Sequence, residues 1–202
     1  NAQSRIMSKF MGALGISRAD IVGHDIGGGV AQLMAVKHPA KVNSIVLIDS
    51  VCFDSWPIPE FAPLLEPGVE EKTSPDELID ILNDFMPKGV HDQSVMTDEL
   101  VRMYVGQWSS EQGKAAMFNN MRRLNKEYTQ AIAGELKRLP HQTLILWGDK
   151  DNFQKPQYAP QLAETIPNAS LVWLVNAGHW SIDKQPEKVT KLISDFLQSN
   201  DK

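Results

Sequence analysis

The sequence predicts an α/β fold built on a mostly parallel sheet. Short apolar runs of strand length alternate with segments of helical composition, and this alternation is typical of βαβ units. Four strands are expected, at residues 19–23, 42–49, 143–147 and 171–175. The second of them is continuous and rich in β-branched residues, which indicates a strand buried on both faces of the sheet.

Helices are expected around these strands. Residues 28–38 are helical in composition and are stopped by Pro39, and residues 158–166 form a second candidate. Residues 184–197 carry apolar side chains at helical spacing. The first 14 residues are interpreted as a helix that leads into the first strand.

The interval from Phe53 to Leu139 breaks this alternation. It opens with a proline-rich loop and continues with three helical patterns, which run from Thr73 to Met86, from Thr97 through Trp108 and from about Gly113 to Leu139. Two of them begin with a Ser or Thr followed by acidic residues, as helix N-termini do. We therefore expect an α/β core at residues 1–52 and 140–202, with residues 53–139 inserted as a helical cap.

Composition and charge exclude several classes of partner. The chain has 202 residues, 42% of them hydrophobic, and a net charge of −5 without blocks of like charge. These values indicate a globular protein and predict no nucleic-acid or membrane partner. The apolar runs are too short to span a bilayer. The single cysteine, Cys52, is compatible with a reducing compartment, so a cytoplasmic location is expected.

The strongest chemical signal is the segment Gly23-His24-Asp25-Ile26-Gly27 between a strand and a helix. Glycines that flank a polar residue in this context predict a nucleophile elbow, which raises the central side chain above the strand end. The amide of Ile26, at the start of the helix, is a candidate for the oxyanion hole. The alternatives for Asp25 are an ordinary helix-capping carboxylate and a degenerate site in which hydrolysis has been lost.

An aspartate at this position favours displacement at carbon. Its attack gives an ester between enzyme and substrate, which water then hydrolyses with the help of a histidine and an orienting acid. This chemistry suits alkyl halides and epoxides, whereas attack on a carboxylic ester would give an anhydride. His179 follows the last strand in a Gly-His loop, and Asp151 follows the strand before it. Asp49 is the alternative acid, and Asp149 is also nearby.

These motifs together resemble the α/β-hydrolase family, in particular its branch of haloalkane dehalogenases, haloacetate dehalogenases and epoxide hydrolases. The resemblance implies that the four strands correspond to strands 5–8 of the family sheet and that the first four are absent. It implies no metal and no cofactor. Two explanations stay open for the missing strands: a fragment completed by a complementing N-terminal segment, or a shortened relative that forms a homo-oligomer through its open strand edge.

The resemblance implies a small-molecule substrate, and the residues of the cap do not decide between a halide and an epoxide. Epoxide hydrolases of this family use two cap tyrosines, for which Tyr104 and Tyr128 are the candidates, and many haloalkane dehalogenases carry a tryptophan where this chain has Ile26. Trp56 or Trp108 could supply an indole N–H instead. The remaining candidates for the substrate pocket are His24 and Trp180. The alternative function is a catalytically impaired hydrolase scaffold that acts in binding or self-association.

Overall fold

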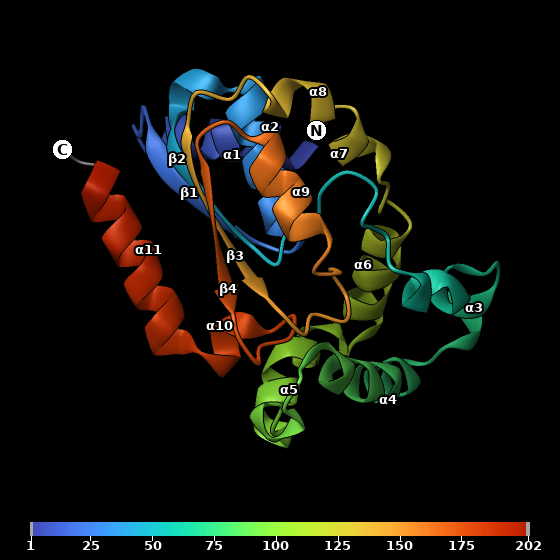
Figure 1. The fold of residues 1–202 in the computed structure, drawn as a ribbon. Coiled ribbons are helices and arrows are strands. Elements are labelled where there is room, and N and C mark those ends of the chain that lie inside the picture. The colour runs from blue at the N-terminus through green and yellow to red at the C-terminus, as the bar shows by residue number, and fades with distance from the viewer. Residues whose placement is uncertain (1, 201–202) are drawn as a thin grey trace.

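The computed structural model describes residues 2–200, in which a parallel sheet is covered by helices (Figure 1). The strands are β1 (Ala19–His24), β2 (Val42–Ile48), β3 (Gln142–Gly148) and β4 (Ala169–Leu174). They lie in the order β1-β2-β3-β4, and every neighbouring pair is parallel. The predicted α/β class and parallel sheet are thus confirmed, with strand ends shifted by at most two residues.

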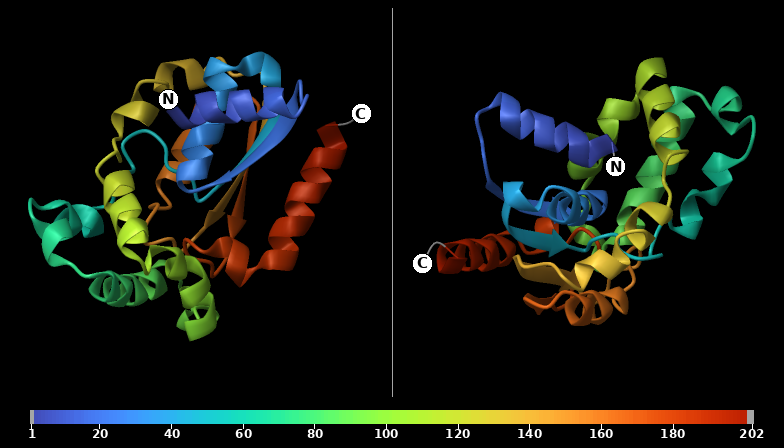
Figure 2. Two further views of the ribbon diagram at one scale, coloured as in Figure 1. Left: turned by 180° about the vertical axis from the view of Figure 1, so that it is seen from behind. Right: turned by 90° about the horizontal axis from the view of Figure 1, so that it is seen from above.

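The two faces of the sheet are covered by different helices. On one face α2 (Ile26–Lys37) and α9 (Tyr158–Thr165) pack against alternate side chains of the central strands, including Ile45 and Trp147. On the other face α11 (Pro186–Asn200) covers the intervening side chains, including Val46 and Leu146 (Figure 2). The helix α1 (Ala2–Ala13) packs against α2. Both faces of β2 and β3 are therefore buried, as the apolar run of β2 predicts.

The strands at the two edges are more exposed than the central ones. In β1, which pairs with β2 alone among residues 2–200, Val22 is 46% exposed. Apolar side chains of α1 are exposed as well, including Ile6, Phe10 and Leu14. An open edge at β1 agrees with the expectation from the sequence, whereas self-association through that edge stays a prediction.

Residues between β2 and β3 form six helices: α3 (Val69–Lys72), α4 (Pro75–Phe85), α5 (Asp98–Val105), α6 (Glu111–Met121), α7 (Glu127–Gln130) and α8 (Ala133–Leu136). Figure 1 shows α4 and α5 beyond the carboxyl ends of β3 and β4. The segment has a hydrophobic cluster of its own, centred on Leu78, Val105 and Phe118. Its end belongs to the sheet instead, because Ile132 and Leu136 pack in the cluster under α2. The division into core and cap stays a prediction.

The helical pattern predicted from about Gly113 to Leu139 does not form one helix. α6 ends at Met121, and the chain turns before α7 starts at Glu127. The side chain of Asn125 accepts a hydrogen bond from the amide of Glu127 at 2.9 Å, which is the local bonding that favours a turn over a continuous helix. The pattern starting at Thr73 is realised as α4, where Ser74 and Glu77 form a capping box.

Within residues 2–200, no helix is both long enough and apolar enough to cross a membrane.

Candidate active site

Asp25 occupies a sharp turn between β1 and α2. Its backbone has φ 49° and ψ −119°, a conformation that costs free energy and is found where the surrounding structure enforces it. The amide of Asp25 donates to the carbonyl of Ile48, and its own carbonyl accepts from Val51, which ties the turn to the end of β2. A Cβ atom on Gly23 would lie 2.3 Å from the carbonyl oxygen of Gly27, so the tight turn requires glycine there.

Three predicted residues come together above the sheet. The Nδ1 atom of His179 lies 3.0 Å from Oδ2 of Asp151, and its Nε2 atom lies 3.9 Å from Oδ1 of Asp25. The first distance is a hydrogen bond, whereas the second is too long for one. His179 is 2% exposed and the side chain of Asp25 is 34% exposed. The buried imidazole therefore faces a carboxylate that solvent or a substrate can reach.

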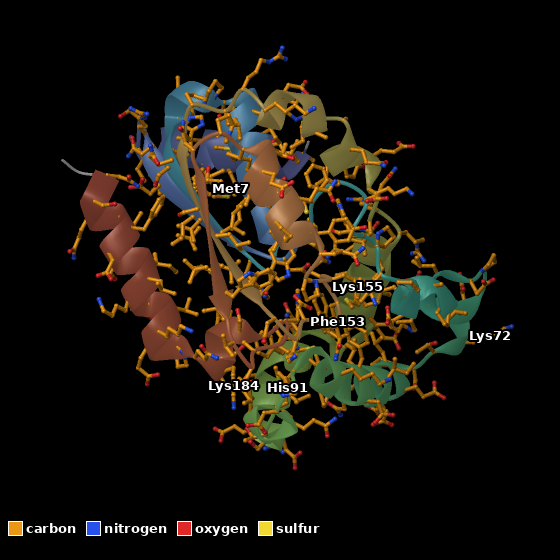
Figure 3. All side chains as sticks on the ribbon, viewed as in Figure 1. Met7, Lys72, His91, Phe153, Lys155 and Lys184 are labelled. Carbon is orange, nitrogen blue, oxygen red and sulfur yellow. The ribbon has the colours of Figure 1, made fainter. Side chains whose placement is uncertain are left out.

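The Asp151 carboxylate is held by backbone groups of its own loop. Its Oδ1 atom accepts hydrogen bonds of 2.8 Å from the amides of Phe153 and Gln154. The other oxygen, Oδ2, is thereby directed to His179. On the opposite side, the amide of His179 donates to the carbonyl of Gly89, so the helical segment also fixes the histidine loop. Figure 3 shows Phe153 in the region beyond the carboxyl end of β3.

Asp49, the alternative acid, makes no hydrogen bond or ion pair with the imidazole of His179 among residues 2–200, and its partners lie elsewhere. It ends β2 with a positive φ of 42° and is completely buried. Its Oδ1 atom accepts from the amide of Gly148 at 2.7 Å, and its Oδ2 atom is bound by the hydroxyl of Ser181. A further hydrogen bond joins its side chain to that of Asp151. Asp149 instead accepts from the amide of Asn176.

Burial changes the protonation of these groups. It lowers the pKa of His179, although the negative charge of Asp25 acts against this. It raises the pKa of Asp25, against the effect of His179 and the Ile26 amide, and that of Asp151, against hydrogen bonds from Gln154, Phe153 and Asp49. The pKa of Asp49 is raised well above its ordinary value, first by burial and then by the charge of Asp151. A neutral His179 is the form that accepts a proton in general-base catalysis.

His24 supports the histidine loop. Its Nε2 atom lies 2.8 Å from the carbonyl oxygen of His179, and the two rings are 4.7 Å apart. Burial, followed by the proximity of His179, lowers the pKa of His24 to about 4, so its ring is neutral near pH 7 and donates one N–H to that carbonyl. His24 thus packs beside the histidine and lines neither of the two hollows described next.

Two hollows lie near the elbow, and Asp25 lines the first of them. The first has a volume of about 40 Å³ and is lined by Asp25, His179, Gln154 and mostly apolar side chains (Ile26, Val51, Trp56, Pro57, Ile58, Phe61, Leu124 and Phe153). The second is a groove of about 620 Å³ between α1, α2, the edge of β1 and the residues around α6 and α7. Both share Ile26, Val51, Trp56 and Leu124 as lining. Hereafter the first is the cavity and the second is the groove.

The predicted pocket residues divide between these hollows and the interior. Trp56 lines both, but its indole N–H donates to Thr129 at 2.7 Å, so it is already used. Tyr128 lines the groove. Trp108 packs in the cluster of the helical segment.

Tyr104 and Trp180 also line neither hollow. The hydroxyl of Tyr104 donates to Asp183 at 2.7 Å, and the indole N–H of Trp180 donates to the carbonyl of Met86. Their rings are 5.0 Å apart. Because these polar groups are paired within the protein, they are not available to a ligand in the conformation described.

Gln154 lines the cavity but was not predicted from the sequence as a pocket residue. It is 2% exposed and lines the cavity, yet its side-chain oxygen has no hydrogen-bond partner among the described residues. Leaving such a group unpaired costs about 1–3 kcal/mol, and an unpaired buried group calls for an explanation. Its place three residues after Asp151 was the available signal, because the loop that holds Asp151 must also face the elbow. Among residues 2–200, no group of three or more His, Cys, Asp or Glu side chains could hold a metal ion.

Comparison with known proteins identifies the family. Residues 2–186 match the alpha/beta hydrolase fold family, and the chain belongs to it. The chain is 30% identical over 192 residues to the 2-hydroxymuconate semialdehyde hydrolase of Pseudomonas putida, covering 94% of this chain and 66% of that protein. It is 31% identical to the hydrolase of the same name from Pseudomonas sp. (strain CF600), covering 94% of this chain and 65% of that one.

Comparison with a solved structure supports the family assignment. The meta-cleavage product hydrolase of Pseudomonas fluorescens IP01 superposes with a TM-score of 0.75 at 26% identity, covering 94% of this chain and 68% of that one. These relatives are meta-cleavage product hydrolases, not the dehalogenases and epoxide hydrolases that the sequence analysis named; the broader family is confirmed. The chain spans about 66% and 65% of the length of the first two relatives.

Proposed function

We propose that the protein is a hydrolase that uses Asp25 as a nucleophile and passes through a covalent ester. The observation that carries this proposal is the position of Asp25: a strained turn presents its carboxylate to a cavity, 3.9 Å from a buried histidine. The histidine is held in turn by Asp151 at 3.0 Å. A nucleophile, a base and an orienting acid are the three roles that such a reaction requires.

In the first step, an oxygen of Asp25 attacks a saturated carbon of the substrate. The new C–O bond forms as the carbon–halogen bond breaks and halide leaves, or as an epoxide ring opens to an alkoxide that takes a proton from water. In the second step, neutral His179 removes a proton from a water molecule that attacks the carbonyl carbon of the ester. The Ile26 amide would stabilise the resulting oxyanion. On collapse, the imidazolium, stabilised by Asp151, gives its proton to the leaving oxygen, so that an alcohol or a diol departs. The Asp25 carboxyl then loses its remaining proton to solvent and is restored as a carboxylate.

A small organic halide or epoxide is the substrate class that fits an aspartate nucleophile. A second candidate comes from the relatives, whose names assign them 2-hydroxymuconate semialdehyde. Hydrolysis of a carbon–carbon bond next to a ketone would require Asp25 to form an anhydride, or to act as a base towards water. The observation in favour of this candidate is 30% identity over 94% of the chain.

The test follows oxygen from labelled water. The protein is incubated with pooled haloalkanes, haloacids and epoxides in ¹⁸O-water, and the peptide containing Asp25 is analysed by mass spectrometry. Label in the Asp25 carboxylate is expected, because water cleaves the ester at its carbonyl carbon. The substrate named for the relatives, 2-hydroxymuconate semialdehyde, forms a separate arm, in which product formation without label in Asp25 would favour the second candidate.

Two substitutions complete the design. Asp25→Asn is expected to lower turnover by about 10³-fold or more, as loss of a nucleophile does, while Asp195→Asn on the exposed face of α11 leaves it unchanged. Halide or epoxide turnover that survives Asp25→Ala would refute the nucleophile. Saturable binding of small ligands without turnover of any tested substrate would instead support the alternative of a catalytically impaired scaffold.

A further inference from the structure

The side chain of Gln154, unlike those of His179 and Asp151, has no hydrogen-bond partner among residues 2–200. Its backbone is fully used: the amide holds Asp151, and the carbonyl accepts from the indole of Trp147 at 2.9 Å. Its carboxamide makes no hydrogen bond with residues 2–200, and the oxygen is buried. The side chain is 2% exposed and forms part of the cavity wall beside Asp25 and His179.

The other fully buried glutamine of the sheet region gives a direct contrast. Gln32, at 0% exposure, donates from its amide nitrogen to Gly28, Ser50 and Val51, although its side-chain oxygen also has no hydrogen-bond partner among the described residues. Those bonds join α2 to the loop after β2, so Gln32 has a structural role. Gln154 has no such role, and nothing in the fold requires an amide at its position. A polar group retained under these conditions points to a ligand.

The cavity around this amide has one polar side and no positive charge. Asp25, His179 and Gln154 form that side, and the rest of the lining is apolar. None of the residues that line the cavity is a lysine or an arginine, and Asp151 lies directly behind His179. A carboxylate placed there would lie against Asp25 without a cation to compensate it, which is unfavourable at low dielectric constant.

We propose that the cavity binds a neutral small molecule through one hydrogen bond with the carboxamide of Gln154, and discriminates against carboxylates. The proposal rests on the proposed function in that it describes the substrate of the same site. It favours neutral halides and epoxides over haloacids. Because the unpaired buried atom of Gln154 is the acceptor oxygen, the ligand group that binds it carries an N–H or O–H, as in propionamide or a haloalcohol.

The experiment measures binding rather than turnover. Propionamide and propionate have nearly the same shape and differ in charge at pH 7.5, so they serve as probes. Their dissociation constants are measured by ligand-observed NMR and by the fluorescence of the tryptophans, of which Trp56 lines the cavity. Propionamide is expected to bind at least tenfold more tightly than propionate.

Gln154→Met removes the amide at nearly constant volume. It is expected to weaken propionamide binding by about 2- to 10-fold, the range of one net hydrogen bond, without lowering the melting temperature. Gln32→Met is the matched control: it breaks three hydrogen bonds, so it lowers the melting temperature but leaves the ratio of the two affinities unchanged. Gln154→Leu repeats the test with a stiffer side chain, since methionine adapts easily.

Several results would overturn this inference: equal or tighter binding of propionate, no binding of either probe, or propionamide affinity unchanged in both Gln154 variants. A melting temperature that falls as far in Gln154→Met as in Gln32→Met would assign Gln154 a structural role instead. Because the probes are not cleaved through Asp25, a failed ¹⁸O-labelling experiment rejects the nucleophile alone and leaves the neutral-ligand site standing.

Discussion

The loops after β2 and β3 each carry a buried carboxyl group, Asp49 and Asp151 respectively, but the two groups are bound differently. After β3, two backbone amides hold one oxygen of Asp151 and leave the other for His179. After β2, both oxygens of Asp49 are bound, one by the amide of Gly148 and one by Ser181. Asp151 is thus arranged as a charged acceptor and Asp49 as a link between loops.

This difference explains why two acids can lie side by side in the same interior. Two ionised carboxylates in contact would repel each other strongly, so such a pair holds one proton. Asp49 is completely buried and its pKa is raised well above the ordinary value by burial and by Asp151. Burial raises the pKa of Asp151 as well, to about 8, but two amide hydrogen bonds and the Asp49 side chain act against this and favour its ionised form. We therefore assign the shared proton to Asp49, which donates it towards Asp151.

The largest effect expected from this comparison is that of Asp151→Asn. The substitution keeps the shape of the side chain but removes the charge that orients and stabilises protonated His179. Turnover of the ester should fall by about 10³- to 10⁴-fold, as for loss of the acid in other hydrolase triads. Single-turnover kinetics would show the labelled or trapped ester accumulating, because formation of the ester does not need the base. A loss of less than about tenfold would show that Asp49 serves His179 instead.

Most of this arrangement could be predicted from the sequence, because it depends on order along the chain. Gly23 and Gly27 mark the turn of Asp25, and parallel strands place Asp151 and His179 at the same edge of the sheet as the elbow. The choice between Asp49 and Asp151 could not be predicted, since both lie within three residues of the carboxyl end of a strand. It depends on backbone amides and on Ser181, which lies more than 130 positions away from Asp49 along the chain.

The pocket was less predictable than the triad for a physical reason. The resemblance suggested cap tyrosines and indole N–H donors, but a tryptophan or tyrosine can instead pair its polar group with another group of the protein. Tyr104 and Trp180 do so with Asp183 and Met86. Gln154 carries no pattern that distinguishes it from a surface glutamine, and only its burial and its unpaired amide single it out.

A smaller effect is expected in the pH dependence. Burial lowers the pKa of His179, so the neutral base should persist below pH 6.5, the ordinary value for histidine. Hydrolysis of the ester should therefore be constant from pH 8 to 6.5 and then fall about tenfold per pH unit once the lowered pKa is passed. An acid limb above pH 6.5 would mean that the negative charges of Asp25 and Asp151 outweigh the effect of burial on His179, which would contradict the lowered pKa of the histidine.

The smallest change in rate is expected for Asp49→Asn, which would sharpen the comparison most. If Asp49 is neutral in the folded protein, asparagine replaces it with little change in shape or charge: its oxygen accepts from Gly148, and its amide donates towards Asp151. Turnover should change by less than about threefold, whereas a loss as large as that of Asp151→Asn would refute the assignment.

The stability of the Asp49→Asn variant provides an independent test. A carboxyl whose pKa is raised on folding contributes stability below its unfolded value of about 4, and that contribution is lost as the pH rises towards the folded pKa. The variant should therefore melt higher than the parent at pH 7, by about 2–4 °C for each kcal/mol recovered, and the two melting temperatures should converge as the pH falls below 4.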